Sequence, residues 1–357
     1  MNRLSSGEKQ LAFVRRVLFS PAEARQELLQ LSRPEFQQIA SLVTSHHVVI
    51  RFCEGFCALA ADLSDIERYE WSANLLWQEH ARIRRAVSFL QDIFGTLSSD
   101  GYEVVVMKTL DHWPDFGSDV DLFTNSTPAD VIHEMTSRFR ARVVERSWGD
   151  RLANKWNFMV PGLPELIEIH VGRLGQTGEL LGFAGSLLSR ARAQNIGDCC
   201  IRVPAAEDRI MICTLQRMYR HFFIRLCDIA DTMHLVETSR IDFDELQAAS
   251  IRSGIWEGVA TFLVVVSDLV ESWRGHGLDL PEPVREAARF GGDQISFARG
   301  FLRVPILPHS VRLYASEWMS LMTQGEVQST VRLSLLPWLA TAAALQHKIT
   351  GSDKGIW

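Results

Sequence analysis

The sequence of 357 residues lacks the features that mark several large functional classes. It has no basic excess, because its net charge is −6, and a large nucleic-acid footprint normally needs one. A local basic patch is still compatible with this balance. Residues 1–19 lack the apolar core of a signal peptide, and apolar runs such as 259–266 are too short to cross a bilayer. These absences predict a cytoplasmic protein without a membrane span.

The cysteines show no spacing typical of a metal site or a redox pair. The six are Cys53, Cys57, Cys199, Cys200, Cys213 and Cys227. None belongs to a Cys-x-x-Cys pair, and two neighbours in sequence, such as Cys199 and Cys200, are hard to join to each other. We therefore expect free, mostly buried thiols in a reducing compartment.

The longest apolar stretch is residues 331–345, and it contains Arg332 and Pro337. A charged residue and a proline are unfavourable inside a bilayer-spanning segment. We interpret the stretch as a buried or groove-facing helix. The alternative is a helix that lies on a membrane surface.

The pattern of apolar residues divides the chain into three parts. Residues 1–100 repeat amphipathic helical patterns, and residues 206–357 are helical in pattern again. Between them, residues 101–205 contain short β-branched strand candidates and a helix that begins at Pro128. The sequence therefore predicts an α+β fold, with a small mixed sheet flanked by N-terminal and C-terminal helical regions.

Two aspartates in the segment FGSDVDLFT, Asp119 and Asp121, are separated by one residue. A strand alternates its faces, so both carboxylates should point to the same side. Two like charges on one face need either solvent at a strand end or a cation between them.

A second predicted strand, ELIEIHVG, adds Glu168 and His170 on one face. Three acids on neighbouring strands repel one another strongly unless cations neutralise them. Magnesium prefers oxygen ligands, and two magnesium ions can activate an attacking oxygen and stabilise a leaving one. The acids therefore point to phosphoryl or nucleotidyl transfer, with Asp119, Asp121 and Glu168 as the metal-side carboxylates.

Lys108 ends the first predicted strand, and Thr109 follows it. A lysine at this place could contact a triphosphate as a point charge, and Thr109 could donate a hydrogen bond to a phosphate. Each feature also has a plain structural reading. A lone Asp-x-Asp occurs by chance, a lysine at a strand end such as Lys108 is commonly solvated, and His170 fits packing or ligand orientation better than metal binding.

The order of these motifs resembles the nucleotidyltransferase superfamily with the DNA polymerase beta-like catalytic fold. The layout is most similar to bacterial proteins described only as the nucleotidyltransferase family. These have a helical N-terminal region, a strand ending in Lys-Gly, an Asp-x-Asp-Leu strand and an acid-x-His strand. The matching segments here are VVVMK (104–108), DVDLF (119–123), LIEIH (166–170) and the polar helix expected over 217–236.

The resemblance implies a magnesium-dependent enzyme that moves a nucleoside monophosphate from a nucleoside triphosphate to an acceptor and releases pyrophosphate. The acceptor would be a small metabolite, a peptide or a protein. Asp119, Asp121 and Glu168 would hold two magnesium ions, and Glu168 could also be the base. The implied nucleotide-binding residues are Lys108, Thr109, Ser118 and Arg225, and His170 and Asp228 would support the site from behind.

The sequence departs from this family at one position. The superfamily places a glycine about ten residues before the acid pair, where the backbone approaches the phosphates. This chain has Thr109 there. Two other functions therefore stay open: a binding or scaffold protein on a degenerate nucleotidyltransferase fold, and a kinase-like transfer of the γ-phosphate by the same acids.

Overall fold

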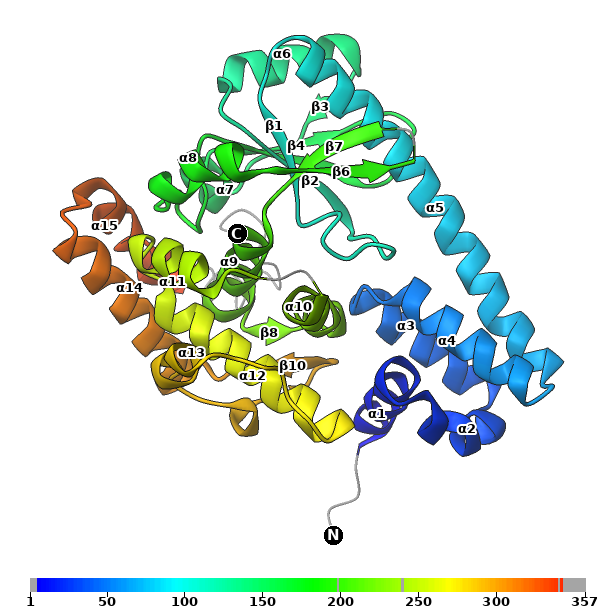
Figure 1. Cartoon of the computed structure of the whole chain (residues 1–357). Coiled ribbons are helices and arrows are strands. Elements are labelled where there is room, and N and C mark those ends of the chain that lie inside the picture. Colours follow the sequence, from blue (N-terminus) through cyan, green and yellow to red (C-terminus); the bar gives the residue numbers. More distant parts are fainter. Residues whose placement is uncertain (1–4, 198, 239–240, 340, 343–357) are drawn as a thin grey trace.

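The computed structural model describes residues 5–197, 199–238, 241–339 and 341–342. A small β-sheet lies at one end of the molecule, with two groups of helices below it (Figure 1). The helices α1–α4 form one group, and the helices from α9 onward form the other. The predicted α+β fold, with a small mixed sheet and helical flanks, is confirmed.

Five helices make up the N-terminal part. They are α1 (Ser6–Phe19), α2 (Pro21–Gln30), α3 (Arg33–Ser45), α4 (Val49–Asp62) and α5 (Ile66–Ser99). Sequence signals fix several starts: a capping box at Ser5 and Glu8 begins α1, and Pro21 occupies the first turn of α2. The long helix α5 packs on α4 near its beginning and reaches the sheet at its other end. It therefore ties the helical part to the sheet.

The central sheet has the strand order β1-β2-β5-β4-β3. Its strands are β1 (Val104–Met107), β2 (Asp119–Thr124), β3 (Arg142–Val143), β4 (Lys155–Met159) and β5 (Leu166–Val171), with α6 (Pro128–Arg138) and α7 (Trp148–Leu152) between them. Strands β2 and β5 are parallel, and the other neighbours are antiparallel. Val120, Leu122, Ile167 and Ile169 face a core that also contains residues of α5 and α6. The alternate residues, which include the acids, face the C-terminal part.

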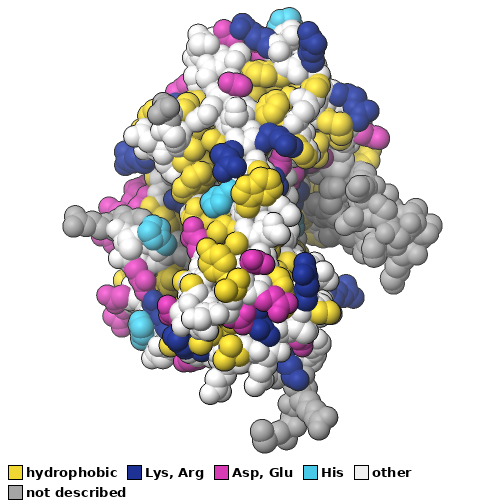
Figure 2. Space-filling view, turned by 90° about the vertical axis from the view of Figure 1, so that its right-hand side faces the viewer, with side chains coloured by type: hydrophobic (Ala, Val, Ile, Leu, Met, Phe, Trp, Pro, Cys, Tyr) yellow, Lys and Arg dark blue, Asp and Glu magenta, His cyan; other side chains and the backbone are white. Residues whose placement is uncertain are grey.

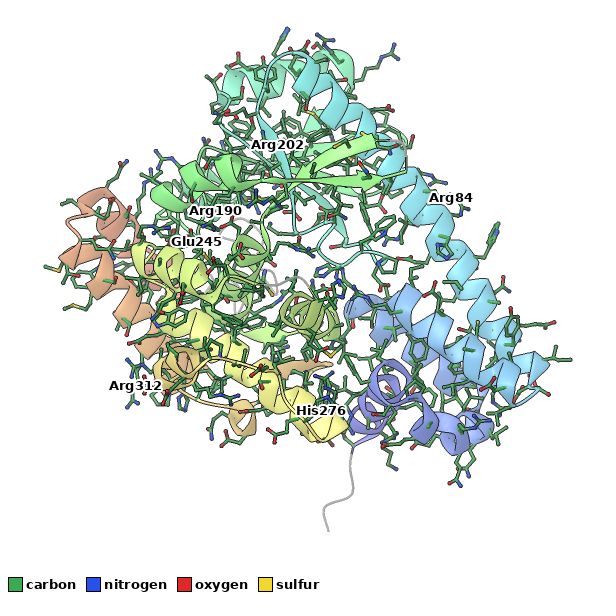
Figure 3. All side chains as sticks on the ribbon, viewed as in Figure 1. Arg84, Arg190, Arg202, Glu245, His276 and Arg312 are labelled. Carbon is green, nitrogen blue, oxygen red and sulfur yellow. The ribbon has the colours of Figure 1, made fainter. Side chains whose placement is uncertain are left out.

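The rest of the chain is mainly helical. Its elements are α8 (Leu181–Arg190), β6 (Arg192–Ile196), β7 (Cys199–Val203), α9 (Ala206–Thr214), the π-helical segment η1 (Leu215–His221), β8 (Phe223–Ile224), α10 (Leu226–Thr238), α11 (Phe243–Arg252), α12 (Trp256–Arg274), α13 (Glu282–Ala287), η2 (Gly292–Gln294), β9 (Ser296–Ala298), β10 (Phe301–Arg303), η3 (Ile306–Ser310), α14 (Val311–Thr323) and α15 (Val327–Leu333). An ion network of Arg190 with Asp208 and Glu245 joins α8 to α9 and α11 (Figure 3).

The helix predicted over residues 217–236 is not continuous. It is broken at Phe222, which has a left-handed conformation with φ of 53°. Strand β8 follows and pairs with β10, so that β8, β10 and β9 form a second small sheet that the helical pattern did not predict. Pairing with a strand some 80 residues away in sequence overrides the local helical pattern.

The prediction for the apolar stretch 331–345 is wrong for part of its described residues. Leu333 is buried, but Val331, Leu335 and Trp338 are exposed. Residues 340 and 343–345 lie outside the described part. No described helix is long and apolar enough to cross a membrane. The six cysteines are free, as predicted, but most are not fully buried. Cys53 and Cys227 are buried, Cys200 is exposed, and the other three are partly exposed.

Glu317 on α14 is a buried carboxyl group, and its position predicts a pH-dependent stability. It is 2% exposed, and its Oε1 has no hydrogen-bond partner among the described residues. Burial, and then the neighbouring Glu179, raise the pKa of Glu317 well above 4.5. The native state therefore binds a proton at Glu317 more tightly than the unfolded state does. The resulting contribution to stability is fully present below about pH 4.5 and is lost as the pH rises through the higher native pKa.

Glu317→Gln should consequently make the protein more stable at pH 8, by about 1–3 kcal/mol. The gain should disappear near pH 4.5. Urea unfolding at both pH values measures it. The control is Glu286→Gln on the exposed side of α13, which should change neither value. Equal pH dependence of the wild type and Glu317→Gln would contradict the prediction.

Candidate functional site

The acidic residues predicted from the sequence meet on one face of the central sheet. Parallel pairing of β2 with β5 places Asp121 directly opposite Glu168, and Asp119 opposite Leu166. Ligand atoms of Asp121, Glu168 and His170 lie within 4.8 Å of one another and could hold a metal ion. Asp119, at the beginning of β2, lies outside this close group. It lines the cavity that opens in front of the acids, together with Asp121 and Glu168.

Two lysines contact these acids. The Nζ of Lys108 contacts Asp121 Oδ1 and lies 3.2 Å from Glu168 Oε1. The Nζ of Lys155 lies 3.0 Å from Glu168 Oε2 and 2.8 Å from Asp150 Oδ1. Each Glu168 oxygen therefore has its own ammonium partner. Lys155 was not predicted, because its place beside His170 depends on the pairing of β4 with β5.

The environment separates the acidities of the two facing carboxyl groups. Burial raises the pKa of Asp121 above its usual range, although Lys108 opposes this. Burial would also raise the pKa of Glu168, but Lys108 and the hydrogen bond from His170 hold it well below its usual range. Burial and Lys108 lower the pKa of His170 to about 4. His170 is therefore neutral at pH 7 and can donate its Nε2 proton to Glu168 Oε1 at 2.8 Å.

Thr109 holds the turn after β1 against the acidic strand. Its Oγ1 accepts a 2.7 Å hydrogen bond from the backbone N–H of Asp121 and donates a 3.3 Å bond to the carbonyl of Asp119. The left-handed residue of the turn is Lys108, with φ of 56°. The hydroxyl of Thr109 is thus engaged by β2. This contact explains how a side chain fits at this position, where the nucleotidyltransferases that the sequence resembles have glycine.

Replacing Thr109 with valine should destabilise the protein by about 1–3 kcal/mol, because the buried Asp121 N–H loses its acceptor. Thr109→Ser keeps the hydroxyl and is the matched control, with an expected loss well below that of valine. Denaturant unfolding of the three proteins measures the difference. Equal stabilities of the serine and valine variants would show that the hydroxyl contributes nothing.

A cavity of about 240 Å³ opens in front of the acids. Its lining residues are His47, Lys108, Thr109, His112, Gly117, Ser118, Asp119, Asp121, Lys155, Glu168, Gln216, Arg217, Arg220, His221 and Arg225. The sheet supplies the acidic wall. The segment from η1 to the start of α10 supplies a cationic wall, and His47 comes from the connection between α3 and α4.

The cationic wall has guanidinium groups that no acid neutralises. Among the described residues, Arg220 and Arg225 have no carboxylate partner, and Arg225 Nε is buried without a hydrogen-bond partner. The Arg225 guanidinium lies 5.5 Å from the Phe223 ring centroid. Arg217 differs, because its Nε lies 2.7 Å from Asp228 Oδ2. The cavity therefore offers uncompensated positive charge to an anion.

Arg225 and Asp228, which were both expected on the helix after the sheet, lie in different environments. Arg225 precedes α10 and lines the cavity, whereas Asp228 lies on α10, is 1% exposed and does not line it. Asp228 accepts bonds from the Arg217 side chain and from the Arg225 backbone N–H, the latter at 2.7 Å. It is therefore a buried support of the cationic wall.

The sequence reasoning missed several lining residues, among them His47, His112, Lys155 and Arg220. Arg220 had a readable signal, because residues 217–225 contain three arginines and a histidine. His47 and His112 had none, because tertiary packing alone brings them here. The N-terminus of α4 is held to the loop that carries His112 by Asp115, whose Oδ1 accepts from the Ile50 N–H at 2.6 Å.

Basic and acidic side chains are interspersed on the molecular face drawn in Figure 2, and no single sign of charge covers it. This distribution agrees with the net charge of −6. No protein-family model matches the chain, and no curated protein matches it. The geometry of the site therefore carries the functional argument.

Proposed function

We propose that this protein is a magnesium-dependent nucleotidyltransferase. It would move a nucleoside monophosphate from a nucleoside triphosphate to a small metabolite, peptide or protein and release pyrophosphate. One observation carries the proposal: Asp121 and Glu168, paired in register, face Arg220 and Arg225 across one cavity. A carboxylate wall suits divalent cations, and an uncompensated guanidinium wall suits phosphates.

The donor set fits magnesium. Asp119, Asp121 and Glu168 offer carboxylate oxygens, the ligands that magnesium prefers. When bound there, magnesium would activate the acceptor oxygen and stabilise the leaving pyrophosphate. Because its pKa is held low, Glu168 stays ionised and serves as a ligand rather than as a strong base.

Other side chains would bind and orient the nucleotide. Arg220 and Arg225 can each donate two parallel hydrogen bonds to phosphate oxygens. Phe223 restricts the plane of the Arg225 guanidinium. The hydrogen bond from His170 keeps Glu168 turned toward the cavity. Lys108, which lines the cavity, can leave the acids for the triphosphate when a metal ion replaces its charge.

A second function has a specific observation in its favour. Lys108 and Lys155 already neutralise Asp121 and Glu168, so the site is stable without a metal ion. A protein that binds nucleotide without turnover would use the arginines and keep the lysines in place. A kinase-like transfer of the γ-phosphate would use the same acids and release a nucleoside diphosphate.

Product analysis separates these functions. The purified protein is incubated with magnesium, the four nucleoside triphosphates and the small-molecule and peptide fractions of a cell extract. We expect pyrophosphate release by the wild type and not by Asp119→Ala/Asp121→Ala. Equal release by both proteins would refute the enzyme, and nucleoside diphosphate as the product would identify the kinase-like reaction. Nucleotide binding without either product would identify the binding protein.

A further inference from the structure

The helices α14 and α15 carry a concentration of exposed apolar side chains. More than half of the large hydrophobic residues that are exposed in the described chain lie between residues 306 and 338. The two helices form an outer edge of the C-terminal helical part (Figure 1). The exposed residues, which we call the α14–α15 face, are Ile306, Leu307, Val311, Met319, Met322, Val327, Val331, Leu335 and Trp338.

The exposed apolar residues follow one side of each helix. On α14 they recur at positions i, i+4, i+8 and i+11, which is the spacing of a single helix side. Residues 327–338 repeat this spacing on α15 and the turn after it. The buried residues of both helices lie on other sides. The first exposed set is Val311, Ala315, Met319 and Met322, and the second is Val327, Val331, Leu335 and Trp338.

Side-chain hydrogen bonds hold the two helices together. The hydroxyl of Tyr314 on α14 donates a 2.9 Å bond to the carbonyl of Leu333 on α15. Trp318 Nε1, one turn later on α14, donates a 2.8 Å bond to Ser334 Oγ. Both donors come from α14 and both acceptors from the end of α15 or the residue after it. The α14–α15 face is therefore held as one unit.

The area of this face suits a stable interface between two proteins. Its large side chains are between 41% and 77% exposed. Side chains of this size offer on the order of 100–200 Å² each when free, so that the face presents roughly 600–900 Å² of apolar surface. The largest apolar patch of a typical monomer covers about 300–600 Å², whereas a stable interface buries about 800 Å² on each partner.

The charged residues at the ends of the face indicate which partner fits it. Arg312 projects outward from the beginning of α14 (Figure 3), and Glu326 lies just after its end. Both are exposed, and neither has an ion-pair partner among the described residues. Helix α14 has 13 residues and is therefore about 20 Å long. Two antiparallel copies of α14 would bring Arg312 of one copy to Glu326 of the other.

The same charges disfavour a lipid surface as the partner. Amphipathic helices on anionic membranes carry several lysines and arginines on their polar side. The other arginine here, Arg332, is turned inward, since its Nη1 donates bonds of 2.9 and 2.8 Å to the carbonyls of Leu152 and Thr177. Arg312 and Glu326 balance each other, so the face offers anionic lipid no net positive charge.

We propose that the α14–α15 face joins two copies of this chain in a dimer with two-fold symmetry. The α14 helices of the two copies lie antiparallel, and the apolar residues of each copy cover those of the other. Arg312 of each copy pairs with Glu326 of the other copy. A two-fold interface uses the same patch on both copies, which suits a face that is apolar along its length and oppositely charged at its ends. The inference does not rest on the proposed nucleotidyl transfer.

Sedimentation equilibrium of the full chain tests the dimer. We expect the wild type at about 10 μM to have twice the chain mass of 40.4 kDa. Met319→Glu should raise the dissociation constant about 100-fold or more, because each substitution acts twice in a two-fold interface. The matched control is Met159→Glu on β4, where the methionine is 44% exposed against 52% for Met319 and lies outside the face. It should leave the dimer unchanged, and circular dichroism shows that both variants fold.

Charge reversal tests the pairing of the two copies. Arg312→Glu and Glu326→Arg should each weaken the dimer about tenfold, and the double variant should restore it to within about threefold of the wild type. A wild type that stays monomeric would overturn the proposal, and so would an undiminished dimer of folded Met319→Glu or a double variant that is weaker than either single one. A monomer that sediments with phosphatidylserine-containing vesicles would assign the face to a membrane instead and overturn it as well.

Discussion

Asp121→Asn should reduce magnesium-dependent pyrophosphate release by roughly 10²–10⁴-fold. The substitution removes a carboxylate charge that would hold the catalytic metal ion, and such an ion stabilises the transition state by several kcal/mol. Asparagine keeps the size of the side chain and one oxygen. The hydrogen bond from Asp121 N–H to Thr109 involves the backbone and is retained. The expected loss is therefore electrostatic and not a consequence of a distorted strand.

Glu168→Gln should give a loss of the same order, because Glu168 lies opposite Asp121 in the parallel pair. The losses should not add in the double variant, since both residues would hold the same metal ions in the proposed reaction. Nucleotide binding measured without magnesium should survive in all three proteins, because Arg220 and Arg225 would still contact the phosphates. Initial rates of pyrophosphate release and equilibrium nucleotide binding measure these two properties separately.

The matched control for both variants is Asp150→Asn. Asp150 belongs to the same network, since it pairs with Lys155 at 2.8 Å, but it does not line the cavity. Its substitution should change the rate by less than about tenfold. A loss at Asp150 as large as that at Asp121 would show that charge balance in the network, and not metal binding, sets the activity.

The acidic wall was predictable because its signals are local. Alternation along two short strands places Asp119 and Asp121, and then Glu168 and His170, on one face each, and the structure joins these faces by parallel pairing. The sequence could not supply Lys155, because strand order and register are not local properties. A one-residue slip of β4 would have turned Lys155 to the other face.

The cationic wall shows a second limit of what the sequence alone can predict. The residues from 217 to 225 are visibly basic, and even a continuous helix would place Arg217, Arg220, His221 and Arg225 on one face, because their spacing is i, i+3, i+4 and i+8. The sequence could not show that these side chains meet the acidic sheet, because that contact depends on tertiary packing. The break at Phe222 and the pairing of β8 with β10 give Arg220, His221 and Arg225 their places on the cavity.

Thr109 is a position that the pattern of the resembled family did not predict correctly. A glycine was expected because a backbone close to phosphates favours a residue without a side chain. In this chain the positive φ belongs to Lys108, and the Thr109 hydroxyl bonds to the neighbouring strand.

Lys108→Met should increase the affinity for manganese, used as a probe for magnesium, by about tenfold or more in the absence of nucleotide. The Lys108 ammonium contacts both Asp121 and Glu168, so a metal ion must displace it before binding. Methionine is of similar length and carries no charge. Without Lys108, Asp121 loses its ammonium partner and Glu168 keeps only Lys155, which favours a divalent cation by well over 1.4 kcal/mol, the free energy of a tenfold change.

The same variant should bind nucleoside triphosphate more weakly and lose the coupling between the two ligands. In the wild type, a triphosphate that attracts Lys108 frees the acids, so nucleotide and metal should each strengthen the binding of the other by an equal factor. Lys155→Met is the matched control. Lys155 contacts Glu168 but not Asp121, so its loss should raise metal affinity less and leave the coupling in place. Manganese titrations of the three proteins with and without a non-hydrolysable triphosphate measure the six metal affinities. Equal metal affinity of the wild type and Lys108→Met would show that the lysine does not compete for the acids.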